Sequence, residues 1–68
     1  MKIYAPFAGV VRYCVADGEE VTTGTELATV EAIKLEAPVL APAPGTVKRT
    51  QREDFVNVQG GDEIVEIV

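Results

Sequence analysis

The 68-residue sequence contains no histidine and only one cysteine, Cys14. The chain therefore has no Ser/His/Asp or Cys/His set, which excludes nucleophilic triads and the usual zinc sites. A lone cysteine cannot form an internal disulfide, which fits a reducing compartment. Any chemistry must be carried by a group attached to the chain or by a partner protein.

Basic residues are also few. Six lysines and arginines stand against eleven aspartates and glutamates, so the net charge is −5. The acidic residues are spread along both halves of the chain, and the small basic cluster of Lys48, Arg49 and Arg52 does not outweigh them. This balance argues against a nucleic-acid partner and against an anionic membrane surface.

Long apolar runs are missing as well. No apolar stretch is long enough to span a bilayer, and Met1-Lys2 is not followed by the apolar segment of a signal peptide. We therefore expect a cytoplasmic protein without a membrane partner. A chain of this length holds one domain, residues 1–68, with a stability of roughly 3–5 kcal/mol.

What the sequence does contain is a series of short strands and turns. Val10–Val15 and the final segment Glu63–Val68 alternate apolar and polar residues, and no segment keeps a 3.6-residue period. Prolines and glycines interrupt the chain at short intervals, which predicts an all-β sandwich or barrel. We expect the glycines Gly9, Gly18, Gly24 and Gly45 to be turn residues with positive φ.

The two halves of the chain resemble each other. Ala5–Val11 and Ala41–Val47 share the pattern Ala-Pro-x-x-Gly-x-Val, and the similarity continues more loosely from 21–30 to 58–67. Each half is too small to bury an apolar face alone. We therefore expect the halves to pack against each other about a pseudo-two-fold axis.

The stretch Val30–Val39, VEAIKLEAPV, ends the first half and begins the second. We predict a tight hairpin with Ile33 and Lys34 at its centre, which leaves Lys34 at the tip, in water. The predicted cross-strand pairs are Ala32 with Leu35, Glu31 with Glu36, Val30 with Ala37, Thr29 with Pro38 and Ala28 with Val39.

This register sorts the hairpin side chains into two faces, because successive side chains of a strand point to opposite sides. Thr29, Glu31 and Glu36 share the polar face, where the two glutamates oppose each other at a cost of ~0.2–1 kcal/mol. The predicted apolar face holds Ala28, Val30, Ala32, Leu35, Ala37 and Val39. Leu35 could therefore simply pack on the core.

The residues Glu31-Ala32-Ile33-Lys34-Leu35-Glu36, flanked by Pro6-x-x-Gly9 and Pro42-x-x-Gly45, resemble the biotinyl/lipoyl attachment domains. Among these they are most similar to the biotin carboxyl carrier proteins, whose usual tip is Glu-Ala-Met-Lys-Met-Glu. The resemblance covers essentially the whole chain. It implies a flattened β-barrel, a barrel-sandwich hybrid of two antiparallel four-stranded sheets with quasi-two-fold symmetry and an exposed lysine hairpin.

The resemblance also implies a function. Lys34 matches the lysine that becomes amide-linked to biotin, and Ile33 and Leu35 match the flanking methionines that help a biotin protein ligase to recognise the tip. Glu31 and Glu36 are candidates for ligase recognition, or else simply solubilising charges. The domain would be a non-catalytic carrier that shuttles a carboxyl group between biotin carboxylase and carboxyltransferase subunits or domains.

Two alternative functions stay open. A lipoyl domain would carry acyl groups or electrons on lipoate at the same lysine. Lipoyl tips, however, commonly place an acidic residue before the lysine and an alanine after it, unlike Ile33 and Leu35. An unmodified barrel-sandwich adaptor is the alternative from another class, because both methionines of the biotin tip are replaced.

Two turns depart from the pattern of the family. A two-residue turn with positive φ at both centres would strain the β-branched Ile33, so we expect either an altered turn or visible strain. The second half has no glycine to match Gly18, and the corresponding position is Phe55. Either Glu53-Asp54 form a shortened turn there, or the turn is built without glycine.

Overall fold

The computed structural model describes residues 1–50, 53 and 55–68, and within them it contains eight β-strands. They are β1 (Lys2–Tyr4), β2 (Gly9–Tyr13), β3 (Glu20–Val21), β4 (Glu26–Glu31), β5 (Glu36–Leu40), β6 (Gly45–Arg49), β7 (Val56–Val58) and β8 (Glu63–Ile67). No helix in this described part of the chain is long and apolar enough to cross a membrane.

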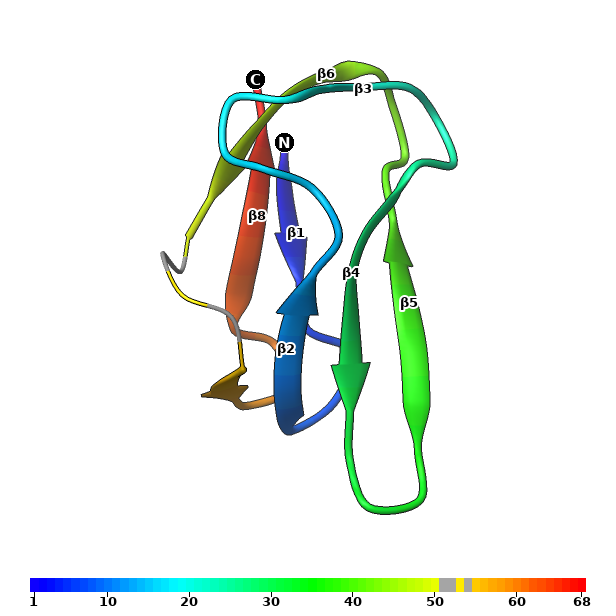
Figure 1. The fold of residues 1–68 in the computed structure, drawn as a ribbon, viewed down its shortest axis with the longest axis vertical. Coiled ribbons are helices and arrows are strands. Elements are labelled where there is room, and N and C mark those ends of the chain that lie inside the picture. The colour runs from blue at the N-terminus through cyan, green and yellow to red at the C-terminus, as the bar shows by residue number, and fades with distance from the viewer. Residues whose placement is uncertain (51–52, 54) are drawn as a thin grey trace.

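The strands form two antiparallel four-stranded sheets, with the orders β1-β8-β6-β3 and β5-β4-β2-β7 (Figure 1). The molecule is flattened, with principal extents of 31 × 21 × 17 Å. The predicted all-β architecture, a flattened barrel of two four-stranded sheets, is confirmed. Because β4 lies between β5 and β2, it is an inner strand of this sheet, whereas β5 is an edge strand.

The turns of the two halves repeat the same backbone hydrogen bonds, which confirms the predicted internal repeat. The offset between equivalent residues is thirty-six before the Phe55 turn and thirty-seven after it, so the second half carries one extra residue. The equivalent bonds run from Gly18 N to Val47 O (2.8 Å) and from Phe55 N to Val11 O (2.7 Å), and from Gly24 N to Ala41 O (2.8 Å) and from Gly61 N to Ala5 O (2.9 Å).

The turn in the second half is built without glycine at the position that matches Gly18. Phe55 has a φ of 61°, and Gly18 has a φ of 87°. Phe55 is the sole non-glycine residue with positive φ in the described ranges, and its ring is exposed. The alternative of a shortened turn involves Asp54, which lies outside the described residues.

The core lies between the two sheets and is built from alternating strand residues of both halves. Complete burial of a valine, leucine or isoleucine side chain contributes about 1.5–3 kcal/mol to the free energy of folding. The largest fully buried side chains are Val11, Leu27, Val30, Val47, Ile64 and Val65. The hydroxyl of Tyr13 is a polar group within this core, and it donates a buried hydrogen bond to Ile64 O at 2.7 Å.

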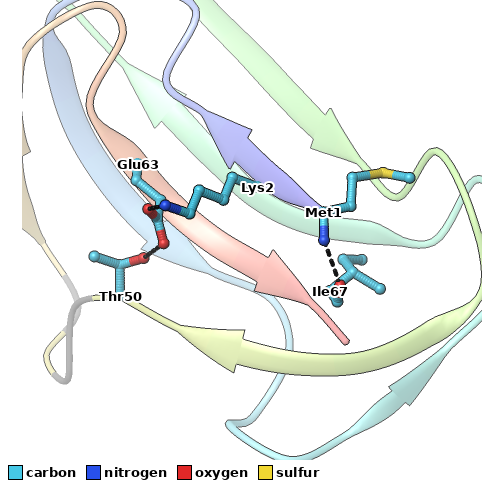
Figure 2. A network of polar contacts seen from close by, with 5 residues as sticks. All are labelled: Met1, Lys2, Thr50, Glu63 and Ile67. Atoms are coloured by element: carbon cyan, nitrogen blue, oxygen red, sulfur yellow. Dashed lines mark hydrogen bonds and ion pairs between the residues drawn. The ribbon is translucent and has the colours of Figure 1, made fainter.

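Edge strand β1 joins the two ends of the chain. The amino group of Met1 donates a hydrogen bond to Ile67 O at 2.7 Å, and Lys2 Nζ lies 3.7 Å from Glu63 Oε1 (Figure 2). The other carboxylate oxygen of Glu63, Oε2, accepts a hydrogen bond from the hydroxyl of Thr50. Both termini lie at the end of the molecule opposite the β4–β5 hairpin (Figure 1). The hairpin therefore points away from both ends of the chain.

Candidate functional site

The β4–β5 hairpin has the predicted register. Glu31 pairs with Glu36, and the pairing continues through Val30 with Ala37, Thr29 with Pro38 and Ala28 with Val39. Beyond the last strand pair, Ala32 N donates to Leu35 O at 2.8 Å, so Ile33 and Lys34 form the connection. In Figure 1 this loop extends past the other strands.

The sequence predicted either an altered turn at Ile33-Lys34 or visible strain at Ile33, and the structure has the altered turn. Neither residue has positive φ, so the hairpin does not use the two-residue turn that needs left-handed backbone at both centres. The physical reason is steric, since a β-branched side chain strongly disfavours that region. The tip is therefore formed without left-handed strain at Ile33.

The tip carries three exposed side chains. Ile33 is 99% exposed, Leu35 is 59% exposed and Lys34 lies between them in solvent. The prediction that Lys34 lies at the tip in water is confirmed. Its Nζ has no hydrogen bond or ion pair with any residue that the structure describes.

The predicted apolar face is buried in the part of the hairpin next to the core and is exposed at the tip. Val30 and Val39 are buried, but Ala32 and Leu35 are exposed. The alternation of a strand sets the side on which a side chain points, but it does not supply anything to cover that side chain. Because the hairpin overhangs the other strands, Leu35 is not packed on the core, contrary to the alternative considered above.

The polar face also holds one surprise. Thr29 lies on it but is only 3% exposed, and its hydroxyl Oγ1 donates to Glu26 Oε1 at 3.2 Å. The hydrogen bond explains why a threonine hydroxyl is tolerated there, because burying it without a partner would cost free energy. Of the predicted polar face, only Glu31 and Glu36 remain accessible beside the tip.

The two glutamates at the base of the tip have different surroundings. Arg12 Nη2 on β2 lies 3.5 Å from Glu31 Oε1, and these side chains are 52% and 43% exposed. Glu36 lies on the edge strand and forms no ion pair within the described residues. Sequence reasoning missed Arg12, because its proximity to Glu31 depends on the pairing of β2 with β4, for which the sequence carries no local signal.

Gly9 and Gly45 also have a role that differs from the prediction. Gly18 and Gly24 have positive φ, as predicted, but Gly9 and Gly45 do not. A Cβ atom on Gly9 would lie 2.5 Å from Glu31 O and 3.2 Å from Val30 Cγ1. Gly9 is therefore required because β2 packs closely against the end of β4, at the base of the tip.

This arrangement limits the chemistry of the tip. The primary amine of Lys34 lies at the end of a flexible side chain in open solvent. Within the described part of the chain, no pocket surrounds it and no acidic or basic side chain is bonded to it. Such a site cannot enclose a substrate. The open space around the amine does, however, fit a group that is attached covalently and must reach other active sites.

Comparison with known proteins identifies the family. A family model described as "biotin-requiring enzyme", the biotin/lipoyl model, matches residues 1–67. The chain belongs to the biotin/lipoyl attachment domain family. Its members are carrier domains that hold biotin or lipoyl on a lysine and are typically not catalytic themselves.

Two relatives of this attachment domain show how much of other proteins it spans. It is 34% identical over 67 residues to mitochondrial pyruvate carboxylase of Mus musculus, a match that covers 97% of the chain but only 6% of the carboxylase. It is 32% identical over 50 residues to the biotin/lipoyl attachment protein of Bacillus subtilis (strain 168), covering 74% of this chain and 68% of that protein.

Proposed function

We propose that this attachment domain is a biotin carrier in which Lys34 is the residue that becomes amide-linked to biotin. The observation that carries the proposal is the overhanging hairpin tip, where a solvent-exposed lysine stands between two exposed apolar side chains, Ile33 and Leu35. Ile33 and Leu35 are then the contacts by which a biotin protein ligase recognises the tip, and Glu31 and Glu36 are further candidates.

Two observations favour biotin over lipoate. The residues beside Lys34 are apolar on both sides, as in biotin tips, and the relative that matches almost the whole chain is a carboxylase. A lipoyl carrier is the second candidate, since the family includes both kinds of domain. An unmodified adaptor is the third, because neither neighbour of Lys34 is methionine.

The residues of the chain have a limited task in this mechanism. In amide formation, Lys34 Nζ attacks the carbonyl carbon of biotin that the ligase has activated as an acyl adenylate, the bond to the adenylate breaks, and the adenylate leaves. The base that takes the proton from Nζ comes from the ligase, since no described residue is bonded to Nζ. Acylation removes the charge of the side chain and leaves a long neutral arm. When bound, biotin supplies a ring that accepts and releases a carboxyl group.

The rest of the domain keeps this arm accessible. The buried segment Leu27–Val30 of β4 and the buried Val39 of β5 anchor the hairpin, and the overhang keeps the tip away from the core. A domain tethered beside two active sites raises the local concentration of the arm at both. The partners we propose are a biotin protein ligase and the biotin carboxylase and carboxyltransferase subunits or domains of a cytoplasmic carboxylase, transcarboxylase or decarboxylase.

The test is the intact mass of the protein after co-expression with a biotin ligase and excess biotin. We expect a gain of one biotinyl group that is absent from the Lys34→Ala variant. A gain only with a lipoate ligase would establish the lipoyl alternative. A folded protein that neither ligase modifies would contradict both carrier functions and leave the adaptor.

A further inference from the structure

Strand β2 contacts the base of the tip at one residue, Glu31, in two ways. The backbone carbonyl of Glu31 lies so close to Gly9 that no Cβ would fit between them. The carboxylate of the same residue forms the ion pair with Arg12 at 3.5 Å. Residues of β2 therefore contact both the main chain and the side chain of Glu31.

The register explains how Arg12 reaches Glu31. On β2, Val10 lies opposite Glu31, and Arg12 lies opposite Thr29. Arg12 and Glu31 are thus diagonal neighbours on the same face, a separation that a long side chain can bridge. Edge strand β5 has no strand on its far side, so Glu36 receives no comparable contact from the described residues.

We propose that Arg12 is a positioning residue for the modification of Lys34. Its guanidinium offsets the repulsion between the opposed carboxylates of Glu31 and Glu36 and holds Glu31 against β2, so that the tip is presented to the ligase in one orientation. This inference rests on the proposed function, because it concerns the same lysine. Arg12 itself touches neither Lys34 nor, in this proposal, the group that is transferred.

The size of the effect follows from the kind of interaction. Opposed like charges in a sheet and partly exposed ion pairs each correspond to less than a tenfold change in an equilibrium constant, so we expect about a two- to fivefold effect. The change should appear mainly in the KM of the ligase for the domain, because the reacting amine is unaltered. It should shrink at high ionic strength, because both carboxylates are exposed to solvent.

The experiment compares Arg12→Gln with Lys2→Gln in biotinylation kinetics at low and high salt. Lys2 is the matched control, since it forms an ion pair of similar length and similar exposure with Glu63, in the sheet that does not contain the hairpin (Figure 2). We expect a two- to fivefold higher KM for Arg12→Gln only, restored largely by Arg12→Lys. In a Glu31→Gln background, which lacks the carboxylate that Arg12 pairs with, Arg12→Gln should have little further effect.

A second readout does not depend on any ligase. Hydrogen exchange of the Ala32 amide, which bonds to Leu35 O across the tip, should be faster in Arg12→Gln than in Lys2→Gln. Equal exchange in the two variants, or an equal KM at low salt, would overturn the proposal. A KM defect that persists in the Glu31→Gln background would also overturn it, because it would indicate a direct contact between Arg12 and the ligase. Failure of the unaltered domain to be modified contradicts the proposed function instead, and the exchange measurement then decides on Arg12.

Discussion

The close approach of β2 to the hairpin makes Gly9 the most sensitive position near the tip. Replacement by alanine would place a Cβ atom 2.5 Å from Glu31 O, almost 1 Å inside an ordinary van der Waals contact. A backbone carbonyl cannot rotate away as a side chain can, so the strands must move apart. We expect Gly9→Ala to lower the free energy of unfolding by roughly 1–3 kcal/mol, as overpacking of a close contact does.

This loss is large for a domain of this size. With a total stability of roughly 3–5 kcal/mol, a loss of about 2 kcal/mol removes about half of it. For a domain of fewer than a hundred residues, the same loss corresponds to a decrease in Tm of roughly 8–16 °C. Urea denaturation and calorimetry measure both quantities directly.

The pseudo-symmetric position Gly45 provides the matched control. A Cβ atom there would meet the Cγ2 methyl of the buried, β-branched Ile67 and also Val68 O at 2.9 Å, so this position is crowded as well. We expect Gly45→Ala to cost a similar amount of stability but to leave the tip undisturbed, because Gly45 lies on β6 in the other sheet. Biotinylation should therefore be slower in Gly9→Ala than in Gly45→Ala when both are assayed well below their unfolding temperatures. A Gly9→Ala variant as stable as the unaltered protein would refute the reasoning.

Three further variants test other parts of the structure. Because Ile33 and Leu35 are exposed, replacing both with methionine should change the free energy of unfolding by no more than about 0.5 kcal/mol while increasing kcat/KM for the biotin ligase; an unchanged rate would contradict their role in recognition. Gly18→Ala places its Cβ in open space at a φ of 87°, so urea denaturation should show a loss of about 1 kcal/mol from the backbone alone. Tyr13→Phe removes the buried hydrogen bond to Ile64 O at 2.7 Å and should cost about 0.5–1.5 kcal/mol in the same assay; a neutral effect would show that this bond contributes no net stability.

Much of the candidate site follows from short-range pattern. The alternation of Val30–Val39 is enough to predict the hairpin, its register and the place of Lys34, because a slip of one residue would turn every side chain to the opposite face. The repeated Ala-Pro-x-x-Gly-x-Val segments likewise predict two similar halves, and the hydrogen bonds of their turns repeat accordingly. These features depend on residues that are close in sequence.

The features that the sequence did not reveal depend on strands that are distant in the chain. Arg12 reaches Glu31, and Gly9 packs against it, only because β2 pairs with β4. Leu35 is exposed because none of the described strands lies opposite the overhanging tip, although its position in the pattern is that of a core residue. Amino-acid pattern therefore determined which way each side chain points along its own strand, whereas only the tertiary structure decided what lies in front of it, since the pairing of remote strands is a property of the whole fold.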